Sequence, residues 1–285
     1  MNFTAEAVQG GNLSASRQNS PLVELVAEMR WLPPSPPAAP QQFGAGVTFL
    51  ASGPSKVDEF FMQFGAKASN LGFTEVERLG MAGFPLVMHQ PVFRFKKPSE
   101  SEDGSLFQVG PGLFTANAVP PYESWERFGP LVQEGVVAML ATRPREERDA
   151  QFLGASLRYI DAFTSHHTGG RDVMTFLKDV FQIEIAIPKA VTRHLREGSG
   201  VLPMLQLQVP MSNGLQMNMA IGEGTTQLGP AIMMDTSVST GALTPTKEAV
   251  MTALNLAHDA IRESFEALIQ PIHHLMPRKQ MNVAQ

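Results

Sequence analysis

A stretch in the middle of the chain, FLGASLRYIDAF (Phe152–Phe163), places charged side chains inside an otherwise apolar strand pattern. Charged groups that are taken out of water need partners, so Arg158 and Asp161 each require one. Successive side chains of a strand point to opposite faces, which puts Arg158 on one face and Tyr159 and Asp161 on the other. The sequence therefore predicts that Arg158 and Asp161 do not pair with each other.

The partners available in a similar context lie on the apolar stretch PLVELVAEMRW, which carries Glu24, Glu28 and Arg30. One interpretation is a structural cross-strand network in which Arg158 pairs with this first strand. Charges with shifted pKa values also gather at functional sites. The alternative is therefore a binding cluster made of Glu28, Arg30, Arg158, Tyr159, Asp161 and His258.

The histidines suggest a second kind of chemistry. The loop SHHTGGRD carries His166 and His167, which could bind a metal ion together with an oxygen of Asp161 or Asp172. Adjacent histidines rarely point to the same place, so the other interpretation is a polar surface loop. His258, on a C-terminal helix, is either a catalytic imidazole or a histidine whose hydrogen bonds are satisfied at the edge of the core.

Composition and missing motifs narrow the classes of function. The sequence has no cysteine, which excludes disulfides, thiolate metal sites and cysteine nucleophiles. A net charge of −5 argues against nucleic-acid binding, which usually needs a basic surface. The motifs of phosphate loops, dinucleotide-binding folds, serine hydrolases and zinc proteases are missing, and we predict no cofactor.

Cellular location is predicted from the N-terminus and from hydropathy. The first residues lack the basic and apolar segments of a signal peptide, and residues 1–19 are polar enough to predict a disordered tail. No run approaches the roughly 20 apolar residues that span a bilayer. We therefore expect a soluble, cytoplasmic protein without a membrane partner.

The elements that must position these side chains follow one order twice, strands and then a helix. Residues 20–164 predict antiparallel strands and an amphipathic helical segment, PYESWERFGPLVQEGVVAMLATR, which Pro130 should kink or whose start it should shift. Residues 165–285 predict three strands and a long amphipathic helix, capped by Thr244 and with Pro245 at its first position. We predict an α+β fold of antiparallel β-meanders, each covered by a helix, in two similar halves that form one compact unit.

Four stretches together carry a resemblance to a known family: PLVELVAEMRW, LFQVGPGLFTANAVPPYESWERF, LGASLRYIDAF and LNLAHDAIRESFEALI. The chain resembles a sporadically distributed family of uncharacterised bacterial proteins. These share an LRYIN-like strand and a last helix with the motif H-x-x-I-x-x-x-F. Asp161 stands where the family more often has Asn. The patchy distribution implies an accessory gene cassette of the phage-defence, toxin–antitoxin or specialised biosynthetic kind.

These observations favour a non-enzymatic accessory protein that binds another protein, or a second copy of itself, through its sheet or its long helix. The 16 methionines, several of them in the last three predicted strands, are interpreted as core residues or as part of such an interface. The alternative is a metal-dependent enzyme with a site around Asp161, His166 and His167.

Overall fold

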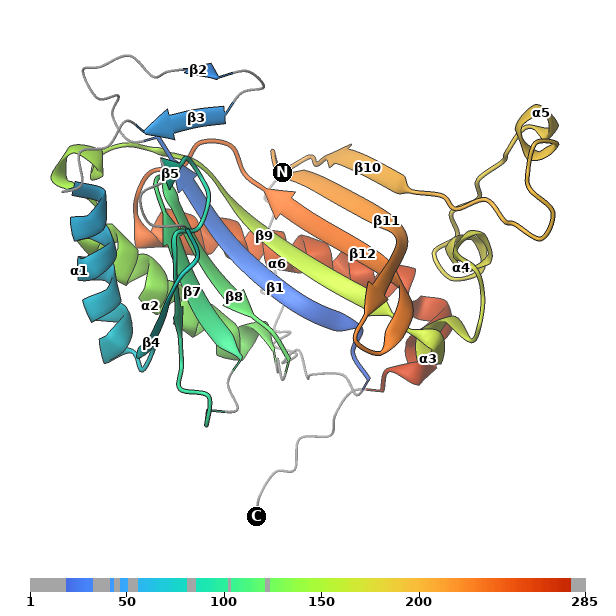
Figure 1. Cartoon of the computed structure of the whole chain (residues 1–285), viewed down its shortest axis with the longest axis horizontal. Helices are drawn as coiled ribbons and strands as arrows, with labels where there is room; N and C mark the ends of the chain where they lie inside the picture. Colours follow the sequence, from blue (N-terminus) through green and yellow to red (C-terminus); the bar gives the residue numbers. More distant parts are fainter. Residues whose placement is uncertain are drawn as a thin grey trace, which may run out of the picture.

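The structure is a computed structural model that describes residues 19–32, 42–43, 47–50, 56–80, 86–101, 104–120 and 124–277. The predicted disordered tail, 1–19, lies outside the described residues except for Asn19. The predicted α+β class is confirmed, because one large antiparallel sheet packs against several helices (Figure 1). Within the described residues, no helix is both long and apolar enough to cross a membrane.

The large sheet has nine strands in the order β10-β11-β12-β9-β1-β8-β7-β6-β4, and all neighbours are antiparallel. Its strands are β1 (Leu22–Trp31), β4 (Glu75–Arg78), β6 (Phe93–Lys96), β7 (Ser105–Gly110), β8 (Leu113–Ala118), β9 (Phe152–Phe163), β10 (Leu205–Pro210), β11 (Gln216–Thr226) and β12 (Gly229–Ser239). A small second sheet contains β2 (Gln42–Phe43), β3 (Val47–Leu50) and β5 (Leu86–Val87). The large sheet therefore runs without a break through both halves that the sequence suggests.

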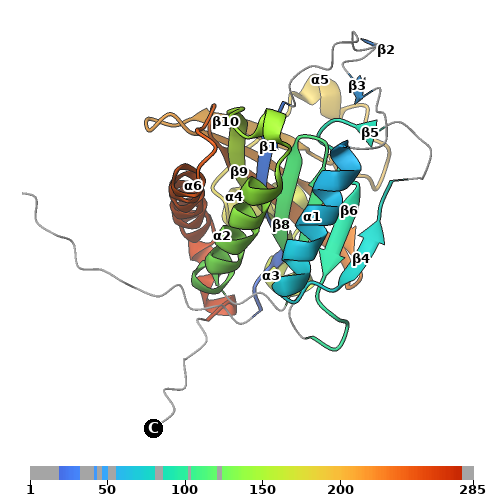
Figure 2. The same cartoon turned by 90° about the vertical axis from the view of Figure 1, so that its left-hand side faces the viewer.

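The longer helices lie on one face of this sheet. They are α1 (Lys56–Asn70), α2 (Trp125–Thr142) and α6 (Lys247–Leu268), and they follow one another across the sheet (Figures 1 and 2). The shorter helices are α3 (Ser165–Thr168), α4 (Val173–Asp179), α5 (Lys189–Thr192), η1 (Arg145–Glu147) and η2 (Gln270–Leu275). In Figure 1 the strands lie in front of α2 and α6, so the face that points to the viewer is the open face.

Period-two alternation explains why one face is covered. In β1, Leu25, Ala27 and Met29 are buried, while Glu28 and Arg30 between and beyond them are not. Burial of apolar surface contributes roughly 25 cal/mol per Å², so the helices pack on the apolar face and the charges stay toward water. β9 repeats this alternation in its first half and pairs with β1, with a register shift near each end of β1.

The start of α6 differs from the prediction. Thr246, and not Thr244, caps the helix, because its Oγ1 accepts a hydrogen bond from the Ala249 N–H at 3.2 Å. The Thr246 N–H donates to the Thr244 carbonyl at 2.8 Å, so these residues form a turn before the helix. Thr244 followed by Pro245 has the composition of a helix start, but the following threonine takes that role.

α2 lies close to the sheet at a glycine. A Cβ atom at Gly135 would stand 2.7 Å from ring atoms of both Phe107 and Phe114. The two rings are buried in the core beneath α2, so they have little room to move. Gly135 is therefore required by packing, although glycine lowers helix propensity.

We predict that Gly135→Ala lowers the free energy of unfolding by about 1–3 kcal/mol, because overpacking outweighs the gain in helix propensity. Urea denaturation measures the change. Gly200→Ala is the control, because a Cβ atom there meets nothing within 4 Å. Equal stability of the Gly135→Ala variant and the wild-type protein would contradict this packing.

Candidate functional site

The predicted binding cluster is divided between the two faces of the sheet. Glu28, Arg30 and Arg158 lie on the open face, since Arg158 is opposite Val26 and Ser156 is opposite Glu28 in the register of β1 and β9. Tyr159 and Asp161 alternate with Arg158 and face the helices, as the sequence predicts. His258 lies on α6, on the helix side. The cluster of Glu28, Arg30, Arg158, Tyr159, Asp161 and His258 is therefore not one site.

The partner of Arg158 is Asp235 on β12, and the prediction that it pairs with the first strand is wrong. Its Nε donates to Asp235 Oδ1 at 2.7 Å and its Nη2 donates to Oδ2 of the same carboxylate. This bidentate bond raises the pKa of Arg158, and the nearby charges of Glu24 and Glu28 add to the effect. On β1, Glu28 instead pairs with Arg30 at 2.6 Å.

On the helix side, Tyr159 and His258 form a hydrogen-bonded pair. The Tyr159 hydroxyl lies 2.8 Å from His258 Nδ1, and the imidazole stacks on the Trp125 ring with 5.3 Å between centroids. The Trp125 indole N–H in turn donates to Asn255 at 2.9 Å. Burial lowers the pKa of His258, so the ring is neutral at physiological pH and joins α2, α6 and β9. Its role in the described structure is packing.

Asp161 is a buried acid. Asp161 is 3% exposed, and no hydrogen bond to its carboxyl group is found among the described residues. Burial raises the pKa of Asp161 to about 8, so the carboxyl group is mostly protonated at pH 7. A protonated carboxyl group is a poor metal ligand and a poor general base.

The histidine loop is held by hydrogen bonds within the fold. His167 Nδ1 accepts the Thr164 N–H at 3.2 Å, and His167 Nε2 bonds to the Asn19 carbonyl at 2.8 Å. Both ring nitrogens are thus used inside the protein, and burial lowers the pKa of His167. His166 Nε2 lies 3.4 Å from the Asn19 side-chain amide. In the part of the chain that the structure describes, no three His, Asp or Glu side chains gather around one point.

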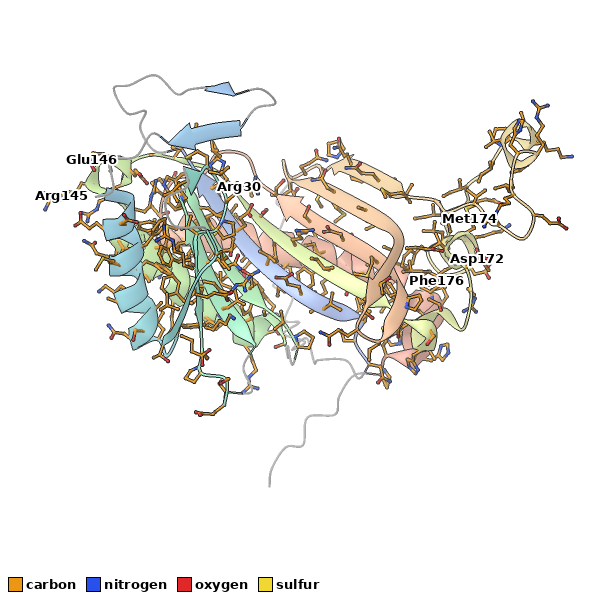
Figure 3. The ribbon with its side chains drawn as sticks, viewed as in Figure 1. Arg30, Arg145, Glu146, Asp172, Met174 and Phe176 are labelled. Atoms are coloured by element: carbon orange, nitrogen blue, oxygen red, sulfur yellow. The ribbon has the colours of Figure 1, made fainter. Side chains whose placement is uncertain are left out.

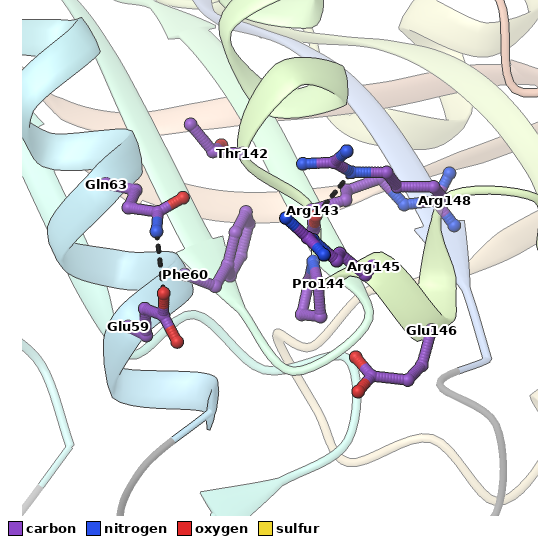
Figure 4. A pocket seen from close by; sticks show the side chains of 9 residues that line it. All are labelled: Glu59, Phe60, Gln63, Thr142, Arg143, Pro144, Arg145, Glu146 and Arg148. Atoms are coloured by element: carbon purple, nitrogen blue, oxygen red, sulfur yellow. Dashed lines mark hydrogen bonds between the residues drawn. The ribbon is translucent and has the colours of Figure 1, made fainter.

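A cavity that the sequence did not suggest opens between α1 and the segment after α2 (Figure 4). It has a volume of about 390 Å³, with Glu59 and Gln63 on one side and Arg145 and Arg148 on the other. The Gln63 amide donates to the Glu59 carboxylate at 2.8 Å, and the Thr142 hydroxyl at the cavity wall donates back to its own helix at 2.8 Å. The described lining offers charges of both signs and no pair of a nucleophile and a base.

Arg143, beside this cavity, has a structural role. It is 1% exposed, and its guanidinium carbon lies 4.8 Å from the Trp31 ring centroid and 4.9 Å from that of Phe152. Its Nη2 donates to the Ala150 carbonyl at 3.0 Å, and burial lowers the pKa of Arg143 to about 10. Arg143 stays charged at neutral pH, and cation–π contacts offset part of the cost of burial. The residue ties the end of α2 to β1 and β9.

The two edges of the sheet differ sharply in charge. The β4 edge reads Glu75-Val76-Glu77-Arg78 and all four residues are exposed. The β10 edge reads LQLQVP (Leu205–Pro210) and carries no charge. Natural sheets protect free edges with charged side chains, prolines or bulges, because an unprotected edge pairs with another chain. By this criterion β4 is protected, and β10 is protected only by proline at its end.

The free side of β10 presents backbone groups at alternate residues. The Met211 N–H bonds to the Leu215 carbonyl at 2.9 Å, which makes this a hydrogen-bonded pair in the β10–β11 ladder. Such pairs alternate in an antiparallel ladder, and the register places Pro210 opposite Gln216. The N–H and C=O groups of Gln206 and Gln208 therefore point away from β11. Among the described residues, no strand pairs with this side.

Apolar side chains gather beside this edge. Met204, the residue before β10, is 89% exposed, and Leu202, two residues earlier, is 70% exposed. A segment that includes α5 extends from the body at the same end, and its Val191 and Leu195 are also exposed (Figure 1). Leu202 and Met204, which lie next to the free strand edge, are therefore candidates for an interaction surface.

The cavity lies far from this end of the molecule. Figure 3 shows Arg145 and Glu146, which line the cavity, at the opposite end from Asp172 of the α4 region.

Comparison of the chain with family models, with curated proteins and with solved structures finds no match. The candidate site therefore depends on the geometry of the chain itself. We define it as the β10 edge surface: the free side of β10 together with Leu202 and Met204.

We predict that Asp161→Asn stabilises the protein increasingly as pH rises from about 5 to 8. The folded-state pKa of Asp161 is raised to about 8, above the unfolded value near 3.9. Between these two values the carboxyl group is ionised in the unfolded state but still protonated in the folded state. The stability of the wild-type protein therefore falls as pH rises over this range. Asparagine removes that loss. Urea unfolding of both proteins at pH 5, 6.5 and 8 measures the difference.

The control is Asp235→Asn, which removes the negative charge and one of the two acceptors that bind Arg158 and lowers stability by about 0–1 kcal/mol at all three pH values. An Asp161→Asn variant whose stability relative to wild type is the same at pH 5 and pH 8 would show that the carboxyl group is not held protonated.

Proposed function

We propose that this protein is a non-enzymatic binding protein that engages another protein chain by strand addition at the β10 edge surface. The single observation that supports the proposal is the contrast between the charge-free β10 edge and the charged β4 edge. An incoming strand would pair with the outward N–H and C=O groups of Gln206 and Gln208. Its side chains would cover Met204 and Leu202.

The free energy of binding at this surface would come from main-chain hydrogen bonds and from burial of apolar side chains. Each main-chain hydrogen bond contributes about 0.5–1.5 kcal/mol net, and apolar burial adds roughly 25 cal/mol per Å². The Met204 and Leu202 side chains, exposed at 89% and 70%, are the largest nearby source of apolar area. The metal-dependent enzyme around Asp161, His166 and His167 has no comparable support, because His167 uses both ring nitrogens within the fold.

The biological setting of this proposal comes from the family resemblance. A partner-binding protein fits an accessory gene cassette for defence, a toxin–antitoxin pair or specialised biosynthesis. The absence of cysteine fits action in the cytoplasm, where thiols are kept reduced and disulfides are rare. Nucleic acid remains an unfavoured partner, since the chain carries a net charge of −5.

We also propose that the sheet consists of two similar halves. β1 pairs with β8, the last strand of its meander, and α2 follows; β9 pairs with β12, the last strand of the second meander, and α6 follows. Both helices pack on the same face. The strand order of the two halves corresponds best if the second half begins with β9 and not at residue 165. On this view each half ends at an outer edge, β4 or β10.

We predict that Gln208→Pro weakens partner binding by about 10- to 100-fold, because proline removes an outward N–H and obstructs the incoming strand. The measurement is quantitative pull-down of co-expressed host proteins, and of untagged copies of this chain, on the tagged full-length protein.

The matched control is Val76→Pro on β4. The Leu79 N–H bonds to the Val92 carbonyl at 2.8 Å, so Val76 by alternation points its N–H to the outer side of the β4 edge. Circular dichroism verifies that both variants fold. A partner that the Gln208→Pro variant retains as well as the Val76→Pro variant does would contradict binding at β10.

A further inference from the structure

We infer that the chain which pairs with β10 is a second copy of this protein, joined across a two-fold axis that passes through Leu207. The inference rests on the proposed function, because it names the partner at the same surface. Closed symmetric dimers require a surface that is complementary to itself. The β10 edge meets this requirement in its side chains, its backbone groups and its charge.

The side chains of β10 match themselves in antiparallel pairing about Leu207. Leu205 of one copy lies opposite Val209 of the other, and Gln206 lies opposite Gln208. Apolar residues thus meet apolar residues on the helix side, and amides meet amides on the open face. Each cross-strand pair of this kind contributes roughly 0.2–1 kcal/mol, and the symmetry uses every pair except the central one twice.

The backbone groups match in the same register. Gln206 and Gln208 point their N–H and C=O groups outward, so opposite copies exchange both hydrogen bonds. Pro210 also points outward but has no N–H, so in this register its carbonyl meets the N–H of Met204 and the Met204 carbonyl has no donor. The two pairs of Gln206 with Gln208 still exchange both hydrogen bonds. An axis at Gln208 would instead set Pro210 opposite Gln206 and leave only the central Gln208 pair with both hydrogen bonds. The position of Pro210 therefore favours the axis at Leu207.

Electrostatics favour this edge for self-association. Two copies of a chain with a net charge of −5 repel each other on approach. The chain carries no charged residue from Gly198 to Gly222, which includes all of β10. Self-pairing of β4 would bring Glu75 and Glu77 close to their own copies or to each other, depending on register. Repulsion is thus weakest where the backbone is free to pair.

Cysteine cross-linking tests the register, because the sequence has no cysteine of its own. Leu207 would form a pair without hydrogen bonds at the axis, with Cα atoms about 4.5 Å apart, within the range that disulfides span. We expect oxidised Leu207→Cys protein to become a covalent dimer. Leu205→Cys alone should not cross-link, because Leu205 meets Val209, whereas the double variant Leu205→Cys/Val209→Cys should.

Light scattering on the uncross-linked wild-type protein gives the second readout. We expect twice the chain mass of 31.0 kDa at micromolar concentration, and a shift to 31.0 kDa in the Gln208→Pro variant. Monomeric wild-type protein that still binds a host protein through β10 would overturn the second copy but keep the proposed function. Monomeric protein without any β10-dependent partner would overturn both. A dimer that survives Gln208→Pro and cross-links at neither position would overturn pairing through β10.

Discussion

The antiparallel pairing of β1 with β9 is the constraint on which the rest of the structure depends. It joins strands from distant parts of the chain at the centre of the sheet, and the remaining strands extend outward from it in both directions. Its alternation sends most apolar side chains toward the helices and puts Glu28, Arg30 and Arg158 on the open face, with the buried Asp161 as the exception. Arg143, between Trp31 of β1 and Phe152 of β9, fixes one end of the pair to α2.

A sheet that grows from its centre must end in two edges, and this protein ends them differently. β4 presents charged side chains, whereas β10 presents glutamines, apolar residues and free backbone groups. An edge without charge is a liability unless a chain covers it. The proposal that β10 binds another chain accounts for this difference between the edges.

Much of the fold follows from local sequence patterns, but side-chain partners do not. The opposite orientation of Arg158 and Asp161 is correct because alternation is a local property. The predicted partner of Arg158 is wrong because the partner depends on which strands are neighbours. β12, which carries Asp235, lies on the other side of β9 from β1. The role of Arg143 does not follow from the sequence, because the residue stands in a segment of mixed charge and only the fold brings Trp31 and Phe152 to it. The charge-free run from Gly198 to Gly222 is visible in the sequence, yet only the strand order shows that it forms an edge.

Hydrogen–deuterium exchange of individual edge amides tests most directly whether β10 is covered by another chain. The outward amides of Gln206 and Gln208 on β10 are compared with those of Val76 and Arg78 on β4, across a range of protein concentration. If another chain covers β10, the amides of Gln206 and Gln208 exchange slowly, and their exchange becomes faster on dilution. The amides of Val76 and Arg78 exchange fast at every concentration. Fast exchange at all four amides at every concentration, in the isolated protein and in its host extract, would contradict the account.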